Sequence, residues 1–517
     1  MRCLARAPLL PLLLLLALAP AAGCGSAEPE PLTFPPGFIF GTSVAGFQAD
    51  MGCPTLGAAC DDPNSDWYVF ITNPDLVADP GTYQVGDPPS VGPGMWETYA
   101  QDFDRAKNEL ANNGLRLSIE WSRIFPTATD GVEGYEALSA LADQEAVAHY
   151  HAVFQALRAR GLEPLVTLNH YALPTWIHDT VGCHHDITTC SPRGWVDSDR
   201  TVAEIAKYAG FCAQEFGGEV DLWATLNEPF AVVFPGYLYP SSDRANPPSV
   251  MLKTDQARTV LRALIEAHAR MYDAVKANDT VDANGDGVAS QVGVVYAISP
   301  IAPKDPENPL DVDAAQNVFY LWNLVYLNGV VKGDVDENLD GTTTHYDSLA
   351  NRMDYLGINY YSRPTVEGLD GPAIPKLSPL TNFNPLTIEP WSDYPHGIYD
   401  MIMMVSGWGL PVIITETGAA DPNDDGSSSS WLVRYATWVH RAIRDGADVR
   451  GFFYWTLMDN YEWNHGMSIR MGLYAVDKND PTKTRVPRTG VATYAAFAST
   501  GTISVELQKR YPAPEKE

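Results

Sequence analysis

Eight short apolar runs, each separated from the next by a longer segment that includes helical periodicity, constrain the fold of this 517-residue chain most strongly. Short apolar runs suit buried strands, whereas apolar residues that recur every three to four positions suit amphipathic helices. The predicted strands are Phe38–Gly41, Leu115–Ile119, Glu163–Leu168, Leu222–Leu226, Gln291–Ala297, Tyr355–Tyr360, Val412–Thr415 and Gly451–Thr456. The predicted helices between them include Trp96–Asn112, Ala146–Arg160, Leu252–Lys276 and Trp431–Asp445. This alternation is typical of βα units around a parallel sheet.

The long irregular stretches all follow predicted strands: 49–94, 171–198, 229–250 and 362–392. In a (β/α)8 barrel, the segments after the strands build the C-terminal face, where active sites lie. We therefore predict an α/β fold, a single (β/α)8 TIM barrel with long βα loops on the C-terminal face, over residues 37–517. A doubly wound open sheet is the alternative, but no Gly-rich phosphate loop follows any of the strands.

The N-terminus predicts export. Arg2 and Arg6 precede the apolar run Leu9–Leu18, which is too short to span a bilayer and suits a cleaved signal. Residues 1–24 resemble a bacterial lipoprotein signal, which implies lipidation of Cys24 and a membrane-anchored, periplasmic or cell-surface protein. Ordinary cleavage nearby is the alternative, because Ala21 stands where that signal prefers Leu. Residues 25–36, rich in Pro and Glu, are interpreted as a tether.

Four of the remaining cysteines form two pairs with the same seven-residue separation, Cys53 with Cys60 and Cys183 with Cys190. This spacing suits two small disulfide loops in an oxidising compartment. Zinc ligation is the weaker interpretation, since no Cys-x-x-Cys spacing occurs. Cys212 lies in an apolar helical pattern and is expected to be a buried free thiol.

The charge of the chain bears on its ligands. With 34 Lys and Arg against 64 Asp and Glu, the formal net charge is -30. Nucleic acid is excluded as a partner, because its phosphates require clusters of Lys and Arg. The balance favours neutral ligands.

Two carboxylates end strand-like runs. Glu228 closes Leu222–Glu228, and Glu416 closes Pro411–Glu416. In a barrel both would point toward the C-terminal mouth. Either one alone is best interpreted as a structural carboxylate. Two together favour an active site, because glycoside hydrolysis needs such a pair. Their sequence spacing does not distinguish a retaining from an inverting reaction.

Several ordered motifs resemble glycoside hydrolase family 1 from Phe38 to about Tyr511. They are Phe40–Gln48, Glu120–Pro126, Leu226–Pro229, Gly357–Tyr361, Ile414–Gly418 and Tyr454–Trp463. The segments Ala45–Gln48 and Gly92–Trp96 are similar to the archaeal-type β-glucosidase/β-galactosidase branch. The resemblance implies a retaining mechanism with Glu228 as acid/base and Glu416 as nucleophile.

The same resemblance assigns supporting residues. Arg116, Asn359 and Tyr361 would support the nucleophile. Asn227 would hold the sugar 2-hydroxyl. The other substrate-binding residues would be Gln48, His170, Tyr171, Trp455, Glu462 and Trp463. The mixture of polar groups and aromatic faces suits a neutral, hydroxyl-rich ring.

Two positions depart from the family pattern. Thr417 stands where the family usually has Asn after the nucleophile, which puts the rate of turnover in question. Tyr171 stands where it usually has Trp after the His, and is expected to shift a contact in the sugar wall. Glu462 is generally replaced in members that act on 6-phosphorylated sugars, because a carboxylate repels phosphate. Its presence favours β-glucosides, β-galactosides or β-fucosides.

Three Asp-x-Asn-x-Asp-Gly segments, at 282–287, 336–341 and 421–426, begin like calcium loops. The expected twelfth-position Glu is absent, because Gly293, Asp347 and Leu432 occupy those positions. Acidic turns are the favoured interpretation, and structural calcium is supported only weakly. No catalytic metal or cofactor is expected, since the two-carboxylate reaction requires neither.

The function predicted is hydrolysis of terminal β-linked sugars from small saccharides or glycosides. A catalytically weak glycan-binding surface lipoprotein, supported only by Thr417, is one alternative. A transglycosylase that uses the same residues is the other.

Overall fold

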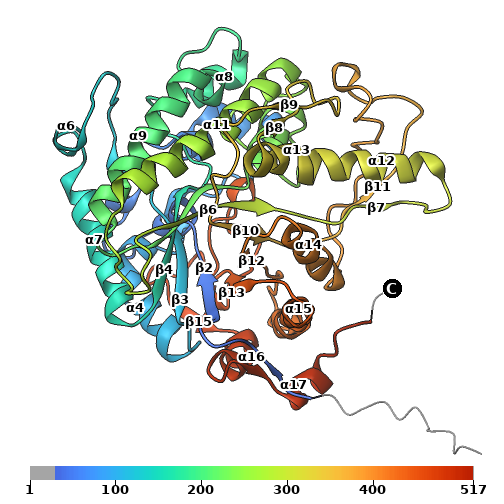
Figure 1. Cartoon of the computed structure of the whole chain (residues 1–517). Helices are drawn as coiled ribbons and strands as arrows, with labels where there is room; N and C mark the ends of the chain where they lie inside the picture. The colour runs from blue at the N-terminus through green and yellow to red at the C-terminus, as the bar shows by residue number, and fades with distance from the viewer. Residues whose placement is uncertain (1–29, 516–517) are drawn as a thin grey trace, which may run out of the picture.

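The computed structural model describes residues 30–515, and its centre is a closed barrel of eight parallel strands (Figure 1). The strands are β2 (Ile39–Ser43), β3 (Gly114–Ser118), β4 (Glu163–Asn169), β5 (Leu222–Asn227), β6 (Gln291–Ala297), β10 (Tyr355–Asn359), β12 (Val412–Glu416) and β13 (Val449–Trp455). They follow one another around the barrel in sequence order, and pairing of β13 with β2 closes it. The predicted (β/α)8 fold is confirmed, and each predicted strand overlaps an observed one.

Helices surround the barrel in Figure 1. The longer ones are α4 (Met95–Asn108), α7 (Gln144–Ala159), α9 (Ser198–Phe216), α11 (Thr254–Asn278), α12 (Pro309–Phe319), α14 (His396–Ser406), α15 (Ser427–Arg444) and α16 (Thr489–Ala498). Local chemistry sets some of their starts: the Asp143 carboxylate accepts hydrogen bonds from the first amides of α7. Because helices cover the outer face and side chains fill the interior, most strand residues are apolar and buried.

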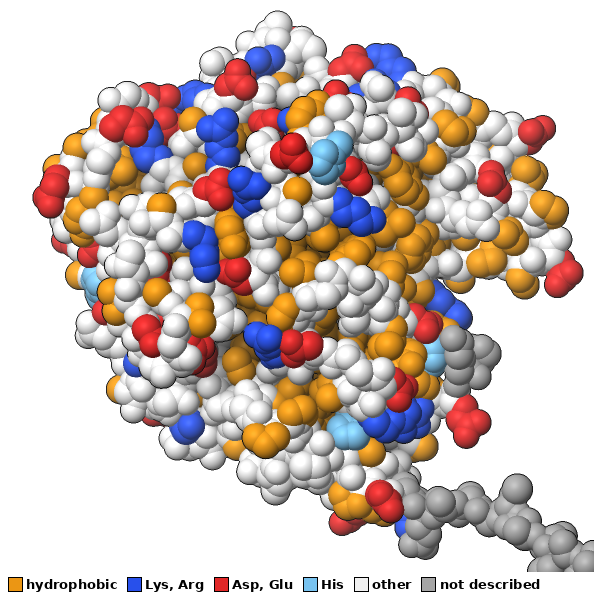
Figure 2. Space-filling view, viewed as in Figure 1, with side chains coloured by type: hydrophobic (Ala, Val, Ile, Leu, Met, Phe, Trp, Pro, Cys, Tyr) orange, Lys and Arg blue, Asp and Glu red, His pale blue; other side chains and the backbone are white. Residues whose placement is uncertain are grey.

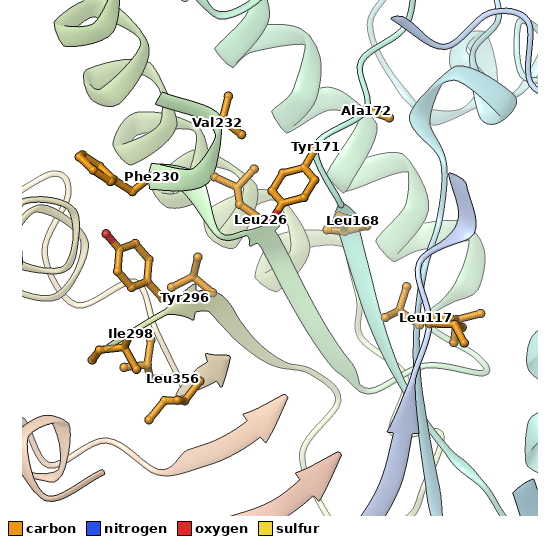
Figure 3. Close-up of a cluster of buried hydrophobic side chains, with 14 of the residues drawn as sticks. Leu117, Leu168, Tyr171, Ala172, Leu226, Phe230, Val232, Tyr296, Ile298 and Leu356 are labelled. Atoms are coloured by element: carbon orange, nitrogen blue, oxygen red, sulfur yellow. The ribbon is translucent and has the colours of Figure 1, made fainter. Parts of the chain in front are cut away.

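Two apolar layers hold the barrel together. The inner layer fills the barrel with Leu165, Leu222, Ala224, Val295, Tyr355, Ile413 and Phe453. The outer layer lies between strands and helices, and Figure 3 shows part of it, including Leu117, Leu168 and Leu226. The strand ends therefore project from a buried, apolar base.

The predicted tether is wrong in its second half. Residues of β1 (Leu32–Thr33) pair antiparallel with β16 (Thr502–Ile503). Phe34 is 4% exposed and packs against Phe38, with ring centroids 4.6 Å apart. The folded unit therefore begins before residue 37. The predicted signal 1–24, with Cys24, lies outside the described residues.

Both predicted disulfides are present, Cys53–Cys60 and Cys183–Cys190, with Cα atoms 6.2 and 5.0 Å apart. Cys212 is a buried free thiol on α9, as expected. Within residues 30–515, no helix combines the length and the apolar character that crossing a membrane requires. On the face shown in Figure 2, Lys and Arg side chains are scattered among Asp and Glu. Such scattering is unlike the basic stripe of a nucleic-acid-binding surface.

Candidate active site

The two glutamates lie at the C-terminal ends of β5 and β12, on the same barrel face, with β6 and β10 between them. Glu416 is the last residue of β12 and is 4% exposed. Glu228 follows β5 directly and occupies the N-cap position of the short helix α10 (Pro229–Val233), without a capping hydrogen bond from its side chain. Its backbone φ of 44° lies in the left-handed region. In a residue other than glycine, this conformation costs energy and concentrates at functional sites.

Glu416 is held by a cation and a phenol. Arg116 of β3 donates from Nη1 to Oε1, and the Tyr361 hydroxyl donates to Oε2 at 2.7 Å. Burial raises the pKa of Glu416 to about 7, and repulsion from Glu228 acts in the same direction. Arg116 and Tyr361 oppose this rise, so they favour the ionised form that a nucleophile needs.

Glu228 contacts a different pair of donors. Asn359, the last residue of β10, donates from Nδ2 to Oε1 at 2.7 Å. The Tyr171 hydroxyl donates to Oε2. Two predicted placements therefore change. The Asn359 side chain donates to Glu228 rather than to Glu416, although its backbone is the register partner of Glu416 in the β10–β12 pairing. Tyr171 does not stand only in a sugar wall, since its hydroxyl reaches the carboxylate.

Asn227 connects the two halves of the site. Its Oδ1 accepts from Arg116 Nη2 at 2.7 Å and from Asn359 Nδ2 at 3.2 Å. Its Nδ2 donates to His170 Nε2 at 3.1 Å. A continuous chain of hydrogen bonds thus runs from Glu416 through Arg116, Asn227 and Asn359 to Glu228. Such a network holds both carboxylates in fixed orientations.

Buried polar atoms without protein partners lie in the same region. Gln48 of α1 (Gly46–Asp50) donates to Glu462 at 3.1 Å, but its Oε1 has no partner within the described chain. Nδ1 of His170 is also unpaired in the part that the structure describes. Burial and the Arg116 charge lower the pKa of His170 well below its usual range, which keeps the ring neutral. Buried polar atoms are normally hydrogen-bonded, so a ligand rich in hydroxyl groups suits these positions.

Aromatic rings stack around His170. The rings of Trp455 and Trp463 lie 5.9 and 5.8 Å from it, nearly parallel. Phe47 stacks on Trp463 at 5.9 Å. Burial raises the pKa of Glu462 to about 7, against the opposing charge of Arg244. The structure therefore brings every predicted site residue to this one face of the barrel.

Sequence reasoning missed Arg244. This residue lies in the loop after β5, and its guanidinium is 3.9 Å from Glu462. The same group lies 5.1 Å from the Tyr171 ring and 5.0 Å from the Trp463 ring. Nearby, Trp391 is 63% exposed and donates to Asp243 at 2.6 Å. A single Arg or Trp in an irregular loop carries no periodic signal, so the sequence offered no sign of either.

Thr417 is the other departure from the family pattern, and its side chain is hydrogen-bonded to α15 (Ser427–Arg444) rather than to either carboxylate. Its side chain is fully buried, and its Oγ1 accepts from Trp431 Nε1 at 2.9 Å. The residue therefore ties the end of β12 to α15.

The three acidic turns use their carboxylates on their own backbone. Asp282 accepts from the Gly285 and Gly287 amides, and Asp421 accepts from the Asp425 amide. Asp336 accepts from the Gly341 amide in the same way. Across residues 30–515, no group of three or more His, Cys, Asp or Glu side chains is arranged to hold a metal ion. The structure lends no support to the calcium interpretation.

Comparison with known proteins agrees with this geometry. The chain matches the family described as "Glycosyl hydrolase family 1" over residues 30–502. It is 34% identical to a β-galactosidase of Pyrococcus woesei over 496 residues, which covers 88% of this chain and 94% of the relative. A β-galactosidase of Saccharolobus solfataricus is 32% identical, with 93% and 98% covered. The crystal structure of the β-glycosidase from Thermosphaera aggregans superimposes with a TM-score of 0.79 at 29% identity, with 93% and 100% covered.

Proposed function

The chain belongs to glycosyl hydrolase family 1 and is a glycoside hydrolase, and we propose that it is a retaining β-glycosidase. In this proposal, it releases terminal β-linked glucosyl, galactosyl or fucosyl residues from the non-reducing ends of small saccharides or glycosides. Glu416 attacks the anomeric carbon and forms a glycosyl-enzyme. Glu228 first protonates the leaving oxygen and then takes a proton from the water that hydrolyses this intermediate.

One observation carries the assignment of roles. Glu416 accepts from the Arg116 cation, whereas Glu228 accepts only from neutral donors, Asn359 and Tyr171, among the described residues. A neighbouring cation favours a carboxylate, and neutral surroundings tolerate a carboxylic acid. The pair is therefore arranged for one ionised and one protonated member, which is the division that the reaction requires.

Glu462 and Gln48 support a non-phosphorylated sugar. Their side chains are hydrogen-bonded to each other at 3.1 Å, and Arg244 already pairs with Glu462. A sugar phosphate placed here would meet the Glu462 carboxylate. We therefore expect turnover of aryl β-glucosides, β-galactosides or β-fucosides, and much weaker turnover of their 6-phosphorylated forms.

Kinetics on an activated aryl β-glycoside test the proposal. Glu416→Gln and Glu228→Gln should each lower kcat on the order of a thousandfold or more. Added azide should restore turnover to Glu228→Ala by attacking the intermediate, and the product should be a β-glycosyl azide. Glu506→Gln, which alters an exposed glutamate on α17 (Val505–Arg510), serves as the control and should retain wild-type activity. Wild-type-like activity of either site variant would refute the assignment.

We also propose that the protein is exported and anchored through a lipid on Cys24. The signal-like residues 1–24 and the two disulfides support this, because disulfides persist in oxidising compartments. Mass spectrometry of the N-terminal peptide of the full chain, expressed in a bacterium with lipoprotein processing, should find a diacylglyceryl group on Cys24. An unmodified Cys24, or cleavage elsewhere without lipid, would contradict the anchor.

A further inference from the structure

Tyr171 places a phenol on the acid/base carboxylate. Its hydroxyl donates to Glu228 Oε2, while Asn359 donates to Oε1. We propose that Tyr171 is a positioning residue for Glu228; this proposal rests on the proposed roles of the two glutamates. It orients the carboxyl group and stabilises the carboxylate left behind when Glu228 gives up its proton.

The backbone and surroundings of Tyr171 fix its hydroxyl. The residue directly follows His170 at the end of β4, and its φ of 73° lies in the left-handed region. In a residue with a Cβ, such a conformation costs energy and persists only where the surrounding structure determines it. Figure 3 shows the ring between the ends of β4 and β5, beside Leu226.

Packing confirms that the ring has little freedom. Tyr171 is 5% exposed, and its ring meets those of Trp463 and His170 edge-on at 4.8 and 5.0 Å. The Arg244 guanidinium lies on the same ring, 5.1 Å from its centroid. Because the ring is held from several sides, the hydroxyl is fixed in a position where it can donate to Glu228.

The role of Tyr171 follows from where the proton of Glu228 goes in each step of the reaction. In the first step, the bond from C1 to the leaving oxygen breaks while the Glu416 carboxylate bonds to C1. The Glu228 proton moves to the leaving oxygen, which departs as an alcohol. In the second step, water bonds to C1, its proton returns to Glu228, and Glu416 is released.

Tyr171 keeps its own proton throughout both steps. Burial and the adjacent Glu228 charge raise the pKa of its phenol well above the usual range. A hydrogen bond to a carboxylate is stronger than one to the neutral acid. Tyr171 therefore strengthens as a donor while the Glu228 proton leaves, and it assists the first step most where the leaving group needs that proton.

A leaving-group series tests this role. For Tyr171→Phe, kcat/KM should stay within about twofold of wild type on a dinitrophenyl β-glycoside, whose leaving group departs without protonation. On phenyl and alkyl β-glycosides it should fall on the order of tenfold or more, since a hydrogen bond to a charged group is lost. The dependence of log kcat/KM on leaving-group pKa should therefore steepen.

Controls separate this role from packing. Tyr361→Phe removes a phenol from Glu416 instead, and should slow the dinitrophenyl substrate as well. A uniform loss across the series in Tyr171→Phe, or no loss at all, would overturn the proposal. If Tyr171→Phe does not fold, Tyr171→Met removes the hydroxyl without adding a hydrogen-bond donor and carries the same prediction.

Failure of the proposed function would look different. Wild-type protein would then cleave none of the glycosides, or Glu228→Gln would match wild type across the series. Once both of those results are excluded, the dependence of log kcat/KM on leaving-group pKa in Tyr171→Phe tests the positioning role alone.

Discussion

At the scale of single residues, the active site is built from two similar side chains in unlike surroundings. Glu416 accepts from Arg116 and Tyr361, and Glu228 accepts from Asn359 and Tyr171. Both residues are glutamates, so their chemical identity does not decide which is the nucleophile and which is the acid/base. Their neighbours decide which carboxyl group is ionised when substrate arrives.

Removal of the Tyr361 hydroxyl should change the pH dependence. The pKa of Glu416 is raised by burial to about 7, and the Tyr361 hydrogen bond opposes that rise. Tyr361→Phe should raise this pKa further. Because attack needs ionised Glu416, the acidic limb of the kcat/KM profile should move upward by about one pH unit.

A neighbouring tyrosine provides the control for that measurement. The Tyr360 hydroxyl donates to the backbone carbonyl of Tyr394 and touches neither glutamate. Tyr360→Phe should therefore leave the acidic limb in place. An unmoved or downward-shifted limb in Tyr361→Phe would contradict the description of Glu416.

Motifs predicted which residues gather at the site but not all of their partners. Arg116 and Tyr361 contact Glu416 as the resemblance implied. Asn359 contacts Glu228 instead, because the direction of its side chain depends on the assembled barrel and no local pattern records it. The Tyr171 contact depends on a left-handed backbone, and Arg244 on the path of an irregular loop. Such features arise from tertiary packing rather than from periodicity.

At the scale of elements, the eight strands were predictable because buried parallel strands read as apolar runs. The pairing of Leu32–Thr33 with Thr502–Ile503 was not, since two residues carry no periodicity and the partner lies at the other end of the chain. The loops after β2 and β4 also brace each other: Asp66 accepts from the Leu173 amide at 2.8 Å and pairs with His178 at 2.7 Å.

Loss of the Cys183–Cys190 disulfide should weaken the loop after β4. The bond closes a short loop that begins on α8 (Thr180–Asp186), next to His178. The double variant Cys183→Ala, Cys190→Ala should lower the free energy of unfolding by about 2–3 kcal/mol, measured by urea denaturation without reductant. Cys212→Ala is the control, because it removes a cysteine side chain without breaking a disulfide. Equal stability of the double variant and wild type would show that the bond contributes nothing.

At the scale of the whole molecule, buried acids should make stability depend on pH. Burial raises the pKa of Asp50 to about 7 and that of Glu120 to about 8. Each folded-state pKa lies above the unfolded value, so the folded chain binds more protons in between. This contribution is fully present below the unfolded values and is lost as pH rises toward about 8.

Thermal unfolding across pH tests that statement. The Tm should be higher near pH 5 than near pH 8, and the net charge of -30 adds self-repulsion in the same direction. The double variant Asp50→Asn, Glu120→Gln should show a shallower dependence, because its uncharged amides do not titrate. A Tm that stays flat or rises between pH 5 and 8 would contradict the buried-acid description.

The central claim is that Glu416 becomes covalently bonded to the sugar, and trapping that species measures it directly. The protein would be incubated with a dinitrophenyl 2-deoxy-2-fluoro-β-glycoside of the preferred sugar, then digested and sequenced by mass spectrometry. One fluoroglycosyl group per chain should be added, on Glu416, and activity should be lost. Turnover of the parent glycoside without any such adduct, or an adduct on a residue other than Glu416, would contradict it.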